Sequence, residues 1–92
     1  MNINDVLSDE DIEECLDGTS DIKWIRELIN LSQNDNLIDE ESFADIFAYE
    51  LQKFVDAEEG TEEFQEASQN NWDWGHSIAQ NINDTIASKW ID

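Results

Sequence analysis

One stretch of this chain, from Asp39 to Glu66, places the strongest constraint on how it can fold. It carries eleven carboxylates and a single base, Lys53. Between the acids runs an apolar series whose spacing places it on one face of a helix. The series consists of Phe43, Phe47, Leu51, Phe54 and Val55. The stretch is therefore predicted to give one face to a hydrophobic core and to present an anionic face outward.

The same imbalance extends over the whole chain. Its 92 residues include 24 acids and 4 bases, which give a net charge of −20. A charge of this size is typical of disordered chains. Four Trp, four Phe and a hydrophobic content of 39% nevertheless supply enough large apolar side chains for a core. We therefore predict one folded acidic domain over residues 1–92, with a core of modest size.

The charge can be compared with that of DNA. A folded domain of this length has a radius of gyration of about 12 Å and spans about 30 Å. Duplex DNA carries about one negative charge per 1.7 Å of its axis, so about 20 phosphates occupy a similar length. The predicted charge per unit length of this protein therefore matches that of B-DNA.

The predicted fold class is all-α, a compact bundle of four to five short helices. Residues 2–7 are expected to be an extended or irregular lead-in. Ser8 has the character of an N-cap, because carboxylates at 9–11 then occupy the first helical turn, where the helix dipole favours them. Leu7 and Ile12 are spaced as a hydrophobic staple around that cap. Gly18 is expected to end this first helix.

The remaining helices follow from similar start and stop signals. Thr19 or Ser20 is expected to cap the second helix and Asp39 the third, which should stop at Gly60. Thr61 is expected to cap a short fourth helix, and the polar residues at 69–71 should break it before a final helix begins. Residues 33–37 are predicted to form a loop. The predicted helical ranges are 21–32, 40–59, 62–68 and 73–90.

Two side chains are candidates for catalysis. Cys15 lies on the apolar stripe of the first helix with no base nearby, so it is expected to be a core residue. His76, the only histidine, is spaced to form a surface pair with Asp73. No nucleophile, phosphate-binding or metalloprotease motif is present. The chain is therefore predicted to be a non-enzyme with no catalytic residue and no cofactor.

One segment is a candidate for calcium binding. In its second half the segment 31–43 is similar to an EF-hand loop, with Ile38 and Asp39 at suitable positions. The EF-hand pattern requires oxygen ligands at its first and last positions, where this chain has Leu31 and Ser42. The sequence therefore predicts a capped helix–loop–helix and no bound metal.

Electrostatics narrows the range of partners. A strongly acidic surface repels phosphates and anionic membranes, so neither nucleic acid nor a membrane is expected to bind. Lys23 and Arg26 are expected to pair with acids of the chain, as is Lys53 with Glu50. What remains is a basic protein surface, which is commonest on proteins that bind DNA or RNA. The carboxylates expected on the outer helix faces, here called the acidic row, are Glu10, Glu13, Glu14, Asp17, Glu41, Asp45, Asp56, Glu59, Glu63 and Glu66.

In size, acidity and rows of acids on short helices, the chain resembles the small DNA-mimic inhibitors of phages. These include the anti-restriction proteins Arn and Ocr and several anti-CRISPR proteins. The first five residues, Met1 to Asp5, also look like the start of a small acidic Cas9 inhibitor. The resemblance implies occupation of the DNA-binding site of a host defence protein, a restriction endonuclease or a CRISPR effector, by carboxylates in place of phosphates. Such proteins often dimerise, and Trp72, Trp74 and Trp90 are candidate dimer contacts.

Other interpretations stay open. The acids could form an ordinary solvated surface or an adaptation to high salt. The chain could also be an immunity protein that neutralises a basic nuclease toxin, or an acidic chaperone of a basic DNA-binding protein. With no signal peptide and no apolar run near 18 residues, the protein is expected to be soluble, and the resemblance implies the cytoplasm of a bacterial host cell.

Overall fold

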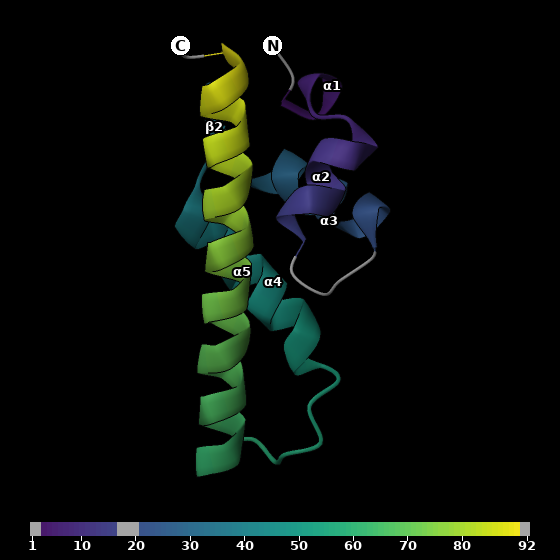
Figure 1. Cartoon of the computed structure of the whole chain (residues 1–92). Coiled ribbons are helices and arrows are strands. Elements are labelled where there is room, and N and C mark those ends of the chain that lie inside the picture. Colours follow the sequence, from purple (N-terminus) through teal and green to yellow (C-terminus); the bar gives the residue numbers. More distant parts are fainter. Residues whose placement is uncertain (1–2, 17–20, 91–92) are drawn as a thin grey trace.

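The computed structural model describes residues 3–16 and 21–90. Within these residues it contains five helices and one small hairpin (Figure 1), which confirms the predicted helical class. The helices are α1 (Ile3–Val6), α2 (Asp9–Cys15), α3 (Ile22–Ser32), α4 (Glu40–Gln52) and α5 (Glu62–Trp90), and the strands are β1 (Gln33–Asn34) and β2 (Leu37–Ile38).

Helix α5 sets the length of the molecule. Its 29 residues correspond to about 43 Å of helix, and the molecule measures 45 × 22 × 17 Å. Helix α4 runs antiparallel to the first half of α5, while α1, α2 and α3 gather beside the second half (Figure 1). The described part of the chain contains no helix with the length and apolarity needed to cross a membrane.

The predicted helix break at 69–71 is wrong, because 62–68 and 73–90 belong to one continuous helix. Asn and Gln cost only a fraction of a kcal/mol each inside a helix. The contacts of this segment with α4 offset that cost: Asn71 Nδ2 donates to Gln52 Oε1 at 3.4 Å, and Gln52 Nε2 donates to the Phe64 carbonyl at 3.2 Å. Thr61 caps the helix as predicted, since its Oγ1 accepts from the Phe64 N–H.

The predicted extension of the third helix to Glu59 is also wrong, because α4 ends at Gln52. The residues that follow include Asp56, Glu58 and Glu59, and negative charge is unfavourable at the C-terminal end of a helix dipole. Phe54, expected in the core, is 80% exposed. The chain instead crosses to α5 through a loop at 53–61, shown at the lower end of Figure 1.

The N-terminal segment is helical where an extended lead-in was predicted. Ile3–Val6 forms one turn that buries Ile3. The guanidinium of Arg26 holds the end of this turn, donating to the Asn4 carbonyl at 2.9 Å and to the Leu7 carbonyl at 2.8 Å. It also pairs with Asp9 at 2.7 Å, which confirms the internal pairing predicted for Arg26, whereas Lys23 makes no ion pair within the described residues. One base thus satisfies carbonyls that a short helix leaves without partners.

Helix caps agree well with the sequence patterns. Ser8 and Asp11 form a reciprocal capping box at the start of α2, and Asp39 caps α4 through the N–H groups of Glu41 and Ser42. Asp21 caps α3. The expected caps Thr19 and Ser20, and the expected stop at Gly18, lie outside the described residues.

The predicted loop at 33–37 is largely a tight hairpin. Its two-residue strands pair antiparallel, and Asp35 adopts a left-handed conformation with φ 56°. The side chain of Asn83 on α5 fastens the second strand, because its Oδ1 accepts from the Ile38 N–H at 2.9 Å and its Nδ2 donates to the Ile38 carbonyl at 3.0 Å. A side-chain amide here makes the two bonds that a neighbouring strand would otherwise make.

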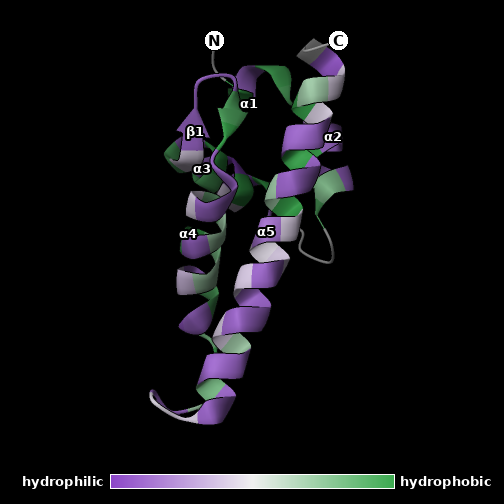
Figure 2. Cartoon of the chain, turned by 90° about the vertical axis from the view of Figure 1, so that its left-hand side faces the viewer, coloured by the Kyte–Doolittle hydropathy of each residue, from purple (hydrophilic) through white to green (hydrophobic). Residues whose placement is uncertain are grey.

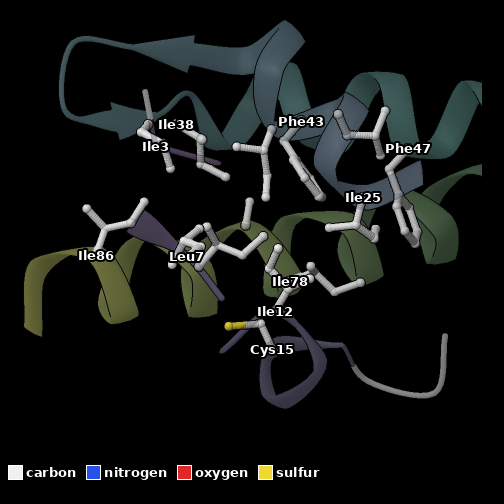
Figure 3. Close-up of a cluster of buried hydrophobic side chains, with 14 residues drawn as sticks. Ile3, Leu7, Ile12, Cys15, Ile25, Ile38, Phe43, Phe47, Ile78 and Ile86 are labelled. Atoms are coloured by element: carbon white, nitrogen blue, oxygen red, sulfur yellow. The ribbon is translucent and has the colours of Figure 1, made fainter. Parts of the chain in front are cut away.

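The core lies beside the second half of α5 (Figure 3). Phe47 of α4 stacks on Trp24 at a centroid distance of 5.3 Å and meets the edge of Trp74 at 5.1 Å. Leu7 and Ile12 are both buried, as the staple spacing predicts. The buried hydrophobic cluster comprises Ile3, Leu7, Ile12, Cys15, Ile25, Leu28, Ile29, Ile38, Phe43, Phe47, Ile78, Ala79, Ile82 and Ile86.

Gly75 permits the close approach of α4 to α5, and its replacement gives a first prediction. A Cβ at this position would lie 2.8 Å from three side-chain atoms of Phe47. Gly→Ala inside a helix normally stabilises by about 1 kcal/mol. Gly75→Ala should instead lower the free energy of unfolding by about 1–3 kcal/mol through overpacking. Urea titration followed by Trp fluorescence measures this, with exposed Ser77→Ala as the near-neutral control; a stabilised Gly75→Ala protein would contradict the packing.

Asp11 ties α2 to the end of α5 and gives a second prediction. Its Oδ2 accepts from Lys89 Nζ and from the Ser8 N–H, and these bonds, that from Lys89 first, lower its pKa below the ordinary 3.8. A carboxyl with a lowered pKa stabilises the fold above its ordinary pKa and loses that contribution as pH falls through the lowered value. Asp11→Asn should therefore be less stable than wild type at pH 7, with the difference shrinking at acid pH.

Unfolding of both proteins in urea at a series of pH values measures that difference. Glu13→Gln, which removes an exposed carboxylate of the same helix, serves as the control and should stay within about 0.5 kcal/mol of wild type throughout. A difference between Asp11→Asn and wild type that persists unchanged at the lowest pH would contradict the assignment.

Candidate protein-binding surface

The structure places nine of the ten residues of the acidic row, and all nine are exposed. Asp17 lies outside the described residues. Glu10, Glu13 and Glu14 belong to α2, Glu41 and Asp45 to α4, Asp56 and Glu59 to the connecting loop, and Glu63 and Glu66 to α5.

These acids form two groups rather than one continuous row. Helix α2 is fastened to the C-terminal end of α5 by the Asp11–Lys89 ion pair, whereas Glu63 lies in the first turn of α5. The 26 residue steps from Glu63 to Lys89 correspond to about 39 Å along the helix. The acids of α2 therefore stand at the opposite end of the molecule from those of the loop and early α5.

Four acids of the second group, Asp56, Glu59, Glu63 and Glu66, lie in a part of the molecule that we call the acidic arm, residues 49–74, while Glu41 and Asp45 precede it on α4. The arm comprises the end of α4, the connecting loop and the first half of α5. None of its side chains is fully buried, and the first half of α5 is coloured mainly as hydrophilic in Figure 2. The arm carries eight carboxylates and one base, Lys53. Along α5, the structure therefore separates a half that bears the core from an anionic arm without fully buried side chains.

The described bases of the protein do not neutralise the carboxylates of the acidic row through ion pairs. Arg26 pairs with Asp9 at 2.7 Å, Lys53 with Glu50 at 3.2 Å, and Lys89 with Asp11. The Glu50–Lys53 pair confirms the prediction from helix spacing. Across residues 3–16 and 21–90, no Lys or Arg makes an ion pair with a carboxylate of the row. The negative charge of the row is therefore directed at solvent or at a partner.

The charge is spread over a longer body than the sequence suggested. A net charge of −20 over 45 Å gives about one charge per 2.3 Å, compared with about 1.7 Å per charge in duplex DNA. The elongation comes from the unbroken α5. The protein is thus anionic on the scale of DNA, although less densely charged than a body of about 30 Å would be.

The predicted His76–Asp73 pair does not form. His76 Nε2 lies 3.6 Å from Glu40 Oε1, and its ring stacks on Trp72 at a centroid distance of 4.9 Å. Asp73 accepts from Gln69 instead, because α5 is continuous through both residues. His76 therefore links α5 to the start of α4.

The candidate dimer tryptophans have roles within the chain. Trp72 Nε1 donates to Asp45 Oδ1 at 2.8 Å, and Trp74 packs against Phe47 in the core. The Trp90 side chain lies outside the described residues. A homodimer contact through these residues stays a prediction.

The EF-hand-like segment 31–43 is divided among the end of α3, the hairpin and the start of α4. Asp39 Oδ1 accepts from the N–H groups of Glu41 and Ser42, each at 3.1 Å, which is the capping role predicted for it. The residues that the structure describes include no group of three or more His, Cys, Asp or Glu side chains able to hold a metal ion.

The structure contains a groove on the acidic arm that the sequence patterns do not predict. It lies between α4, the connecting loop and α5, and its lining includes Tyr49, Phe64 and Trp72. Tyr49 is 68% exposed. The apolar spacing along α4 could have marked Tyr49 as lying off the core face, but only the early end of α4 brings the loop across to form a groove.

Comparison with protein-family models, with curated proteins and with solved structures found no significant match.

Cys15 lies in the core as predicted, 4% exposed, with its Sγ 3.5 Å from Thr85 Oγ1. Burial raises the pKa of its thiol, so the reactive thiolate should form only when the core opens. We expect a thiol reagent at pH 8 to modify the native protein at least about a hundredfold more slowly than the urea-unfolded protein. Absorbance of the released chromophore measures both rates.

A cysteine placed at an exposed site of α5 provides the control. In a Cys15→Ser background, Ser88→Cys should react at similar rates in native and unfolding conditions. Fast labelling of native wild-type Cys15 would contradict its placement in the core.

Proposed function

We propose that this protein is a DNA-mimic inhibitor, which occupies the DNA-binding site of a host defence protein with carboxylates in place of phosphates. The target class is a restriction endonuclease or a CRISPR effector. In this proposal the protein acts in the cytoplasm of a bacterial host cell, by occupying the site and without performing a reaction. A homodimer that lengthens the mimic is compatible with it.

One observation carries the proposal. Nine carboxylates of the row are exposed, and the three bases that form ion pairs, Arg26, Lys53 and Lys89, pair with acids outside the row. An ordinary solvated surface intersperses charges of both signs, whereas here the bases serve the fold. Like charges at neighbouring helical positions, such as Glu62 and Glu66, cost a few tenths of a kcal/mol per pair. A chain that retains such pairs gives up stability while gaining a strong anionic field.

The shape supports the same conclusion. An anionic body 45 Å long and 22 × 17 Å across is comparable in width with a DNA duplex and could lie along a cleft lined by Lys and Arg. Its field would accelerate encounter with such a cleft, and this steering would weaken as salt rises. Duplex DNA and the protein would then compete for one surface.

Charge reversal on the acidic arm tests the proposal. The triple variant Asp56→Lys, Glu63→Lys, Glu66→Lys changes exposed side chains for which the structure gives no hydrogen bond or ion pair. It should leave the fold intact and weaken inhibition at least about a hundredfold, because close charge pairs across an interface contribute strongly to binding. DNA cleavage by a panel of purified restriction endonucleases and Cas nucleases, titrated with inhibitor at several DNA concentrations, measures the effect.

A second triple variant with the same change in net charge distinguishes the contribution of the acidic arm from that of overall charge. Asp5→Lys, Glu27→Lys, Asp84→Lys alters three exposed acids outside the row and changes the net charge by the same amount, from −20 to −14. It should weaken inhibition by less than about tenfold, through steering alone. Equal losses of inhibition in the two triple variants would show that only the net charge matters and not the position of the acids in the row. Cleavage that persists at saturating wild-type protein for every enzyme tried would overturn the proposed function.

A further inference from the structure

The groove on the acidic arm combines an aromatic lining with carboxylates. Its volume is about 680 Å³, within the usual range of sites that enclose a small ligand or a few side chains. Tyr49, Phe64 and Trp72 supply the aromatic rings, Asp45 and Glu59 supply the carboxylates, and Lys53 supplies one positive charge. A groove of this kind offers both apolar contact and negative charge to whatever enters it.

Contacts within the protein fix one of these rings and place a cation beside another. Trp72 donates to Asp45 at 2.8 Å and stacks on His76 at 4.9 Å, so its position does not depend on a partner. Tyr49 is 68% exposed and its ring already has a cation near it, because Lys53 Nζ lies 5.1 Å from the ring centroid. The ring thus occupies an environment in which a positive charge is favoured.

We infer that this groove receives an arginine side chain of the basic partner. A guanidinium is planar, stacks on aromatic faces and donates in a fork that suits a carboxylate. An aliphatic side chain would leave the carboxylates unused, and a second copy of this chain would bring a further charge of −20 to an already anionic surface. The inference rests on the proposed function for the identity of the partner but not for the chemistry of the groove.

Two short peptides of equal charge test the inference on the protein alone. Hexa-arginine and hexa-lysine should be steered equally by the field, so a difference between them reports stacking and forked hydrogen bonding. We expect hexa-arginine to bind roughly three- to tenfold more tightly, with the largest chemical-shift changes at the Trp72 indole N–H and the Tyr49 ring. Calorimetry gives the affinities and NMR the location.

Variants at Tyr49 leave the net charge unchanged. Tyr49→Ala should reduce the preference for arginine to less than about twofold, whereas Tyr49→Phe, which keeps the ring, should retain it. Phe54→Ala removes an aromatic side chain that is 80% exposed and does not line this groove, and it should also retain the preference. Equal affinities of wild type for the two peptides, or equal preferences in Tyr49→Ala and Phe54→Ala, would overturn the inference.

Lys53 provides an independent check, because it occupies the cationic position beside Tyr49. Lys53→Gln should strengthen binding of hexa-arginine more than Lys23→Gln, which removes an equal charge from an exposed position on α3. Equal gains would show that only net charge matters and would count against the groove. A dimer in sedimentation that Tyr49→Ala dissociates would place a second copy in the groove and overturn the assignment.

The two proposals can fail separately. If the arginine preference is found but no nuclease is inhibited, the proposed function fails and the groove stands. If nucleases are inhibited equally by wild type and Tyr49→Ala, and the peptides bind equally, the groove fails and the proposed function stands.

Discussion

The contact between Phe47 and Gly75 is the one on which the rest of the structure depends. Phe47 is fully buried and in ring contact with Trp24, Phe43 and Trp74. A side chain at Gly75 would overlap it, so the absence of a Cβ sets how closely α4 approaches α5. This contact fixes the point beyond which the two helices continue into the acidic arm.

That division explains how so acidic a chain can fold. Every fully buried residue of α5 lies between Gly75 and Ile86, so hydrophobic burial is concentrated in one half of the molecule. Four of the five carboxylates of α5 itself lie in its other half, where repulsion acts on solvated side chains and not on the core. Since exposed like charges cost only tenths of a kcal/mol per pair, a modest core can hold an arm that contributes little burial of its own.

Local sequence signals predicted the parts of this fold that depend on nearest neighbours. The caps at Ser8 and Asp39, the buried pair Leu7 and Ile12, and the placement of Cys15 in the core all follow from spacing and from the needs of helix ends. The break expected at 69–71 does not occur, because contacts with α4 outweigh weak local preferences. Such contacts join residues far apart in the chain, so they cannot be predicted from a local sequence pattern.

The candidate site divides in the same way. Exposure of the row's acids on α2, α4 and α5 could be predicted from helical periodicity, since outer positions follow from knowing the inner face, whereas Asp56 and Glu59 are exposed in the loop that follows α4. The separation of the row into two groups could not be predicted, because it depends on the unbroken α5 and on α2 lying at the far end. Nor could the groove, which requires α4 to end at Gln52 so that the loop brings Glu59 near Tyr49. Phe54 is exposed although the helical pattern places it on the core face, because α4 ends before it at Gln52.

The anionic surface and the groove would contribute differently to the recognition of a basic partner. An anionic surface attracts any basic protein, and its attraction falls with salt, so charge alone distinguishes poorly among the many proteins that bind nucleic acid. Aromatic rings beside carboxylates distinguish arginine from lysine at short range, where screening is weaker and geometry matters. DNA presents no such rings to the side chains that contact its phosphates. A partner held through the groove would therefore bind this protein by a contact that DNA does not offer, which would favour the inhibitor in competition with a polymer of higher charge density.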